Sequence, residues 1–235
     1  MRSFASRSTQ KELIDDLHCD GEELRQTLRE LKTINKLLGG NHVTTDGIQK
    51  LLETSTQQEI TIADIGCGGG DMIRVMYDWS QRKKINARFI GIDANPNTIS
   101  MAKKNLQNLS NIAFETADVL DMEFQEKQVD VITCTLFTHH FTDGELVQMF
   151  RSFRKKTRIG LVVNDLHRHP LAYYSIKILT RLFSKSRLVI NDAPISVQRG
   201  FRRRELEEIL RKAGWDNFSI SWYWAFRWQV VGKKI

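Results

Sequence analysis

The chain has 235 residues, of which 41% are hydrophobic and 27% charged, a composition that suits one globular α/β domain. No run of about 18 apolar residues lacks a charge and residues 1–10 are polar and basic, so neither a transmembrane span nor a signal peptide is expected. Three dispersed cysteines are too few for a disulfide framework or a zinc site, so a reduced, cytoplasmic protein is expected, and the net charge of +7 could attract an anionic partner.

The first predicted element is an N-terminal helix. Leu24, Leu28, Leu31 and Leu38 recur at helical spacing, and the pair at positions 39–40, both glycine, is typical of a helix C-cap. We expect residues 1–55 to form a helical cap outside the main sheet.

A glycine-dense loop follows a short apolar run at residues 62–65. The sequence Asp64-Ile65-Gly66-Cys67-Gly68-Gly69-Gly70-Asp71 then leads into a predicted helix. Glycines allow a sharp turn at a strand's carboxyl end, where open α/β sheets bind nucleotides. The third glycine of a dinucleotide fingerprint is replaced by Asp71, whose carboxylate would repel a phosphate and attract a cationic amine. A nucleoside that carries an amino acid therefore fits better than a dinucleotide.

Strands and helices alternate through the middle of the chain. Buried strands are predicted at residues 88–93, 111–115, 128–133 and 159–164, with helices at 97–107 and 145–158. A helix around residues 206–213 and two strands at 218–222 and 228–231, with no helix between them, complete the chain. This order predicts a parallel sheet covered on both faces and closed by an antiparallel hairpin.

One insertion interrupts the pattern at residues 166–198. Within it, residues 170–183 carry two apolar stripes, one of them Leu171, Tyr174, Ile178 and Leu182. A helix that is apolar on two sides is expected to be buried or to cover something apolar.

The loop pattern Asp64-x-Gly66-x-Gly68-x-Gly70 resembles the first motif of the class I S-adenosylmethionine-dependent methyltransferases. The later elements follow in the order of that family over about residues 60–235. The resemblance implies one domain over residues 1–235 with a Rossmann-like, seven-stranded sheet. It also implies that the 1–55 cap and the 166–198 insert, a candidate lid, lie above the strand ends where a substrate enters.

The resemblance further implies a site for S-adenosylmethionine, with S-adenosylhomocysteine as the product. Asp93 would accept hydrogen bonds from the ribose hydroxyls and Asp118 one from the adenine amine. The implied cofactor-binding residues are Asp64, Gly66, Cys67, Gly68, Gly70, Asp93, Ala94, Asp118, Val119, Cys134 and Thr135.

Catalytic candidates follow the fourth and fifth strands. His139 or His140 could take a proton from a hydroxyl as the methyl group arrives, because a neutral imidazole titrates near neutral pH, and we slightly favour His140. Asp165 could orient a histidine or bind the acceptor. The alternative is that these histidines only pack. No carboxylate pair accompanies the six histidines at ligand spacing, so no metal is expected.

The acceptor is the least constrained part of the hypothesis. Residues 31–40, 163–168 and 192–199 resemble a bacterial methyltransferase subgroup often found beside enzymes of aromatic polyketide or lipid synthesis. This implies O-methylation of a small, partly hydrophobic acceptor, with an unknown oligomeric state. RNA or protein methylation, a catalytically silent binding module and a dehydrogenase are the alternatives. Basic residues are concentrated at 151–158 and 199–204, but nucleic-acid binding is disfavoured because Arg151, Arg154 and Lys155 fit the solvated face of an amphipathic helix.

Overall fold

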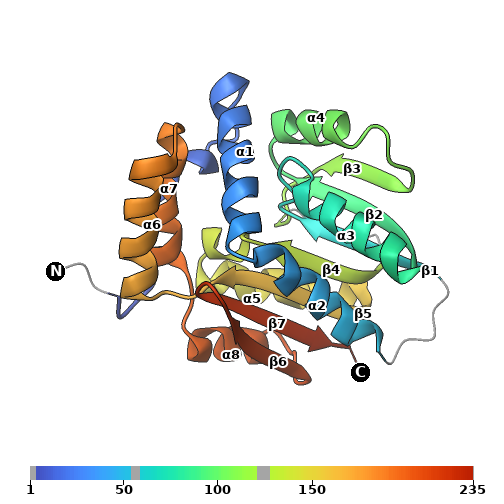
Figure 1. Cartoon of the computed structure of the whole chain (residues 1–235). Coiled ribbons are helices and arrows are strands. Elements are labelled where there is room, and N and C mark those ends of the chain that lie inside the picture. Colours follow the sequence, from blue (N-terminus) through green and yellow to red (C-terminus); the bar gives the residue numbers. More distant parts are fainter. Residues whose placement is uncertain (1–3, 54–58, 121–127, 235) are drawn as a thin grey trace.

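The computed structural model describes residues 4–53, 59–120 and 128–234 (Figure 1). Its strands are β1 (Glu59–Ile65), β2 (Asn86–Asp93), β3 (Ile112–Thr116), β4 (Val129–Thr135), β5 (Thr157–Leu166), β6 (Phe218–Tyr223) and β7 (Arg227–Lys233). Its helices are α1 (Gly21–Leu37), α2 (Gly40–Leu52), α3 (Asp71–Lys83), α4 (Pro96–Asn105), α5 (Asp143–Lys156), α6 (Pro170–Phe183), α7 (Arg187–Arg199) and α8 (Arg203–Lys212). Two short 3-10 turns are η1 (Leu13–Asp15) and η3 (Thr138–His140).

The described strands form one seven-stranded sheet in the order β3-β2-β1-β4-β5-β7-β6. The first five are parallel, and β7 runs antiparallel between β5 and β6. The predicted parallel sheet with a closing hairpin is therefore confirmed. Strand order reverses between β1 and β4, and such a switch point opens a crevice at the carboxyl ends of the strands.

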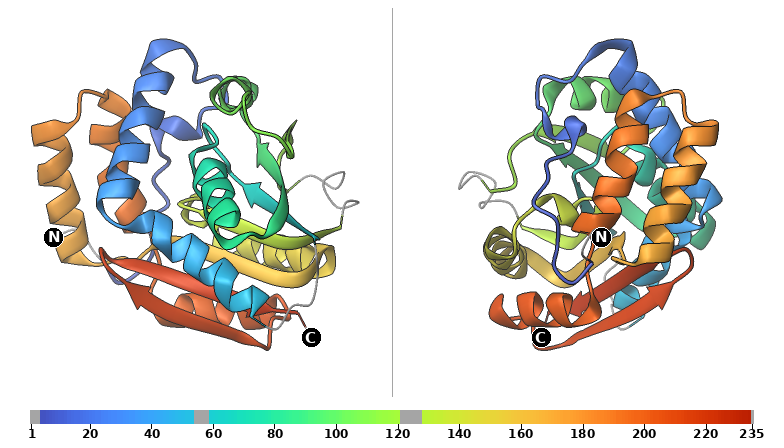
Figure 2. Two further views of the ribbon diagram at one scale, coloured as in Figure 1. Left: turned by 45° about the vertical axis from the view of Figure 1, so that its right-hand side comes forward. Right: turned by 90° about the vertical axis from the view of Figure 1, so that its left-hand side faces the viewer.

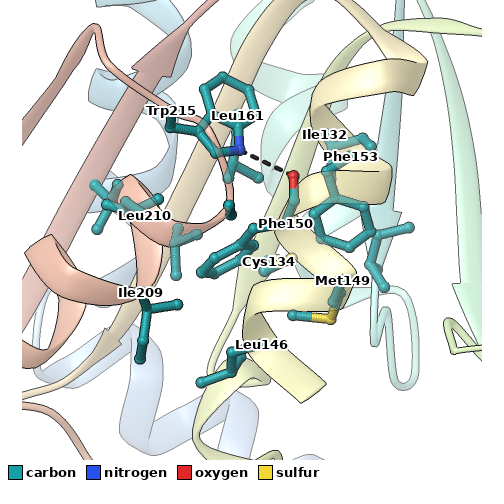
Figure 3. Close-up of a cluster of buried hydrophobic side chains, with 14 of the residues drawn as sticks. Ile132, Cys134, Leu146, Met149, Phe150, Phe153, Leu161, Ile209, Leu210 and Trp215 are labelled. Atoms are coloured by element: carbon teal, nitrogen blue, oxygen red, sulfur yellow. Dashed lines mark hydrogen bonds between the residues drawn. The ribbon is translucent and has the colours of Figure 1, made fainter. Parts of the chain in front are cut away.

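Helices cover both faces of the sheet. Apolar residues of α2, α3 and α4 pack with β1 and β2 on one face. On the other face α5 and α8 bury a second cluster that includes Phe150, Leu210 and Trp215 (Figure 3). The indole nitrogen of Trp215 donates a hydrogen bond to the carbonyl oxygen of Phe150 at 2.9 Å, so the one polar atom of this side chain is satisfied.

Helices α1, α6 and α7 stand beyond the carboxyl ends of the parallel strands (Figures 1 and 2). Neither α2 nor α7 was predicted from the sequence. The sequence of α2 contains Gly47 and neighbouring threonines, which disfavour a helix. Packing on the sheet outweighs this, because a Cβ at Gly47 would lie only 2.6 Å from a methyl carbon of Val162.

The expectation for the helix at residues 170–183 is wrong in one respect. The predicted stripe of Leu171, Tyr174, Ile178 and Leu182 is exposed, at 54–68% of each residue's surface. Only Ala172, Tyr173 and Thr180 of α6 are buried. The helix lies on the outer flank and packs on one side against α7, which leaves the stripe of Leu171, Tyr174, Ile178 and Leu182 uncovered (Figure 2).

Candidate active site

A cavity of about 1280 Å³ opens at the carboxyl ends of β1, β2 and β4. Its walls come from the glycine loop, from α1 and α7, from residues 5–17 and from the turn between β6 and β7. Pockets for drug-sized molecules measure about 300–1,000 Å³. The space therefore suits two ligands side by side rather than one.

The glycine loop forms the floor of this cavity. Gly66, Gly68 and Gly70 have φ angles of +68°, +53° and +80°, a region that favours glycine. A Cβ at Gly66 would lie 2.1 Å from the Phe137 ring, and one at Gly70 2.8 Å from Leu106. At Gly68 the nearest atom would be 3.8 Å away, so this glycine leaves its backbone open to the cavity. Gly70 caps α3 and does not line the cavity.

Asp93 ends β2 and points its carboxylate along the cavity wall. Its two oxygens accept backbone N–H groups, Oδ2 from Gly68 and Oδ1 from Asn95, both at 3.0 Å. Burial raises the pKa of Asp93, and these two hydrogen bonds oppose the shift. The carboxylate is thus fixed in orientation while free lone pairs remain for a ligand.

Asp64 lies deeper, at the end of β1. It is 2% exposed and accepts a hydrogen bond from the Thr133 hydroxyl at 2.8 Å. Burial raises the pKa of Asp64 to about 7, with a smaller contribution from the charge of Asp93. Asp64 borders the cavity and supports the loop from below.

The other predicted cofactor residues divide into two groups. Cys67, Ala94, Asp118, Val119 and Thr135 line the cavity. Cys134 does not, because successive side chains of a strand point to opposite faces and that of Cys134 is fully buried against α5. Its side chain therefore cannot touch a ligand in this cavity.

Asp165 and His139 form a hydrogen-bonded pair at the cavity wall. His139 Nδ1 lies 2.6 Å from Asp165 Oδ1, and the Thr138 hydroxyl donates to Oδ2 at 2.6 Å. Burial alone would raise the pKa of Asp165, but His139 and these hydrogen bonds outweigh it and hold the pKa below its usual range. An ionised Asp165 keeps the proton of His139 on Nδ1, which leaves Nε2 as the acceptor.

His140 has a different partner from the one expected. Its Nδ1 lies 2.5 Å from Asp15 Oδ1, a residue of η1 that the sequence did not indicate. The guanidinium of Arg199 pairs with Asp15 at 2.7 Å and donates to the carbonyl of His139 at 3.0 Å. Arg199 belongs to the basic cluster at 199–204, but it is only 7% exposed, and its ion pairs with Glu12 and Asp15 hold residues 12–15 over the histidines.

Glu12 is the other residue that the sequence did not reveal. Its Oε1 lies 3.5 Å from His139 Nε2 and has no hydrogen-bond partner among the described residues, while Oε2 accepts from the Ser196 hydroxyl at 2.6 Å. Burial raises the pKa of Glu12 to about 7. One ligand atom each of Glu12, His139 and His140 lie within 4.8 Å of one another, a spacing that suits a divalent cation. The sequence did not indicate this grouping, because the fold brings Glu12 across 127 positions of sequence to His139.

The family comparison agrees with the glycine loop and the strand order. Residues 62–160 match a family model described as a methyltransferase domain. No curated protein sequence matches this chain.

Solved structures share the whole fold at low sequence identity. Human N-acetylserotonin methyltransferase in complex with S-adenosylmethionine is 16% identical, with a TM-score of 0.68 over 97% of this chain. The plantazolicin methyltransferase BpumL in complex with S-adenosylhomocysteine is 15% identical, with a TM-score of 0.70 over 95% of each chain. A putative O-methyltransferase from Nostoc punctiforme is 13% identical, with a TM-score of 0.61 over 87% of this chain. The chain spans 60% of the human enzyme and 59% of the Nostoc protein.

Proposed function

We propose that this chain, whose residues 62–160 match a methyltransferase domain, is an S-adenosylmethionine-dependent enzyme of class I that O-methylates a small, partly hydrophobic acceptor with His139 as the base. The observation that carries the proposal is the Asp165–His139 pair, because His139 lines the same cavity as the glycine loop and Asp93 while Asp165 lies behind it. Asp165 acts as a positioning residue, since it touches His139 and is fully buried.

The residues present fit the proposed cofactor. The open backbone at Gly68 leaves room for the methionine portion, and Asp71 at the start of α3 offers its second carboxylate oxygen to the ammonium group, since Oδ1 pairs with Lys32 at 2.8 Å. Asp93 is held by two N–H groups and can accept from a ribose diol, while Asp118 and Val119 border the same cavity. When bound, S-adenosylmethionine supplies an electrophilic methyl group on a sulfonium sulfur.

The protein's own task is to orient the acceptor and remove its proton. In the proposed reaction a C–O bond forms to the methyl carbon as its bond to sulfur breaks, and the hydroxyl proton passes to His139 Nε2. The sulfur leaves as a neutral thioether, and His139 later returns the proton to solvent. Alignment of the reacting groups and proton transfer together account for most of the rate enhancement that such a site provides.

Glu12 occupies the position that the acceptor must reach. Its Oε1 lies beside His139 Nε2, makes no hydrogen bond to a described residue and has Arg199 Nη1 3.7 Å away, and a hydroxyl that displaced it would face the base directly. We infer that residues 12–15 shift when the acceptor binds, and that the ion pairs of Arg199 with Glu12 and Asp15 govern this step.

The nature of the acceptor follows from the remaining walls of the cavity. They are mostly apolar and come from the cap, the insert and the terminal hairpin, with Leu28, Leu31, Ile176, Leu179, Val189 and Phe226 among the lining residues. Such walls favour a phenol or alcohol with an aromatic or aliphatic body over a polymer that is recognised by its charge.

The test uses S-adenosylmethionine with a ¹³C-labelled methyl group and a protein-free cell extract. The ¹³C resonance of the organic-soluble product distinguishes a methyl ether from a C-methyl or N-methyl group. A methyl ether whose yield falls in the His139→Ala variant supports the proposal. Label on carbon or nitrogen, or in precipitated RNA or protein, overturns it.

A further inference from the structure

The outer face of α6 is the largest run of exposed apolar side chains on the described helices. It comprises Leu171, Tyr174, Ile178, Leu182 and Phe183, which are 54–78% exposed. The spacing of Leu171, Tyr174, Ile178 and Leu182 places them on one side of the helix, opposite the buried residues Tyr173 and Thr180, and Phe183 is exposed at the helix end. Single exposed apolar residues are ordinary on a protein surface, but a contiguous face of four with a further exposed ring at its end marks an interaction site.

The charged side chains carried by α6 and its flanks are basic, and one acidic group of another element, Glu30 of α1, reaches the end of α6, where its carboxylate accepts hydrogen bonds from the Ser184 hydroxyl and the Lys185 backbone. Residues 166–191 contain five basic residues and no aspartate or glutamate. Arg168 is buried and paired with Glu205, whereas Arg181, Lys185 and Arg187 are exposed and have no ion pair with a described residue. The apolar face is thus bordered by free cations within a chain of net charge +7.

This face is continuous with the candidate active site. Leu179 is 42% exposed and also lines the cavity, as do Ala172 and Ile176 on the inner side of α6. Trp224, in the turn between β6 and β7, is 71% exposed and lines the cavity as well. That turn contacts the start of α6, because the rings of Phe226 and His169 stack with centroids 5.1 Å apart.

We propose that the α6 outer face and Trp224 dock on an anionic lipid bilayer, with the cavity mouth toward the membrane. Apolar side chains with a basic border and an exposed tryptophan are the features by which amphipathic helices lie in a bilayer interface. Anionic headgroups complement Arg181, Lys185 and Arg187, and an acceptor dissolved in the bilayer could enter without crossing water.

The same charges disfavour a second copy of this chain as the occupant. In a two-fold dimer through this face, Arg181 and Lys185 of each copy would meet an equally basic surface, because a symmetric interface pairs a patch with itself. No acidic residue within 166–191 is present to compensate.

The proposal is tested by co-sedimentation of the full chain with vesicles of phosphatidylglycerol and phosphatidylcholine in equal parts, with pure phosphatidylcholine vesicles for comparison. We expect binding to the anionic vesicles that weakens as salt rises. The double variant Leu182→Asp/Phe183→Asp should bind at least tenfold more weakly, since each large apolar side chain contributes about tenfold or more when it leaves water. Arg181→Ala/Lys185→Ala should also weaken binding and flatten its salt dependence.

Leu37→Asp is the matched control. Leu37 is 77% exposed at the end of α1 and outside both the α6 outer face and the cavity, so this variant should bind vesicles like the original chain. All these variants replace exposed side chains. A thermal unfolding midpoint and an S-adenosylhomocysteine affinity equal to those of the original chain verify that each variant folds. Absence of binding to anionic vesicles, or equal binding by the Leu182→Asp/Phe183→Asp variant, overturns the proposal. The proposal is also overturned if sedimentation velocity shows that the original chain is a dimer and that the Leu182→Asp/Phe183→Asp variant is a monomer. Vesicle binding needs no turnover, so its failure would leave the proposed O-methylation standing.

Discussion

Replacement of Asp93 probes the proposed cofactor site through its best-defined carboxylate. In Asp93→Asn the shape is kept, but the charge and one acceptor are lost. Oδ1 and Oδ2 each accept a backbone N–H at 3.0 Å, from Asn95 and Gly68. An amide group cannot accept both, so either the loop at Gly68 or the backbone at Asn95 loses its partner.

The size of the effect follows from the hydrogen bonds involved. A hydrogen bond to a charged group contributes about 1.5–3 kcal/mol, which corresponds to about a 10- to 150-fold change in affinity. We expect Asp93→Asn to weaken S-adenosylhomocysteine binding by this factor. Asp93→Ala should weaken it at least as much, because both oxygens that face the ribose hydroxyls are removed.

Isothermal titration calorimetry with S-adenosylhomocysteine measures this effect without any acceptor. Asp78→Asn is the matched control, since Asp78 pairs with Arg74 on the outer surface of α3 and does not line the cavity. Its affinity should equal that of the original chain. If Asp93→Asn and Asp93→Ala are folded and bind as tightly as the control, the assignment of Asp93 to the ribose is refuted.

Three further predictions concern the two histidines, a divalent metal and the buried carboxyl group of Asp64. His139→Ala should lower turnover by about 10²-fold or more while S-adenosylhomocysteine affinity stays unchanged, and His140→Ala should lower turnover less. If steady-state assays show the larger loss of turnover in His140→Ala, His140 is the base. Dialysis against EDTA should leave turnover unchanged, because a base needs no metal; a loss that a divalent cation restores would instead make Glu12, His139 and His140 a metal site. The pKa of Asp64 is about 7 in the folded chain and 3.8 as its ordinary value, so between these pH values the folded chain binds more protons than the unfolded chain. The free energy of unfolding therefore falls as pH rises from 3.8 to 7, by up to about 4 kcal/mol. Asp64→Asn keeps an acceptor for Thr133 and should unfold at higher denaturant concentration than the original chain at pH 8 but not at pH 4; parallel curves would contradict this.

Local sequence patterns predicted most of the sheet. Strands β2, β4, β6 and β7 are each a short apolar run bounded by polar or turn residues, a pattern that can be recognised from neighbouring positions in the sequence. The glycine loop could also be predicted from the sequence, because the positive φ angles at Gly66, Gly68 and Gly70 favour glycine at these positions.

The features that were missed depend on contacts between distant segments. Helix α2 forms despite its glycine and threonines because the sheet packs against it, and no local signal indicates this. Glu12 and Asp15 reach the histidines only through the path of residues 4–20 over the cavity. Arg199 looked like a surface cation, since neither its burial nor its partners can be read from the sequence around it.

The most direct test of the proposed reaction is transfer of a radiolabelled methyl group from S-adenosylmethionine to a protein-free extract, with three chains compared in parallel. We predict organic-soluble label with the original chain, near-background label with His139→Ala, and an intermediate amount with His140→Ala. Organic-soluble label formed equally by the original chain and His139→Ala, with cofactor affinity intact in both, would contradict the role of the Asp165–His139 pair.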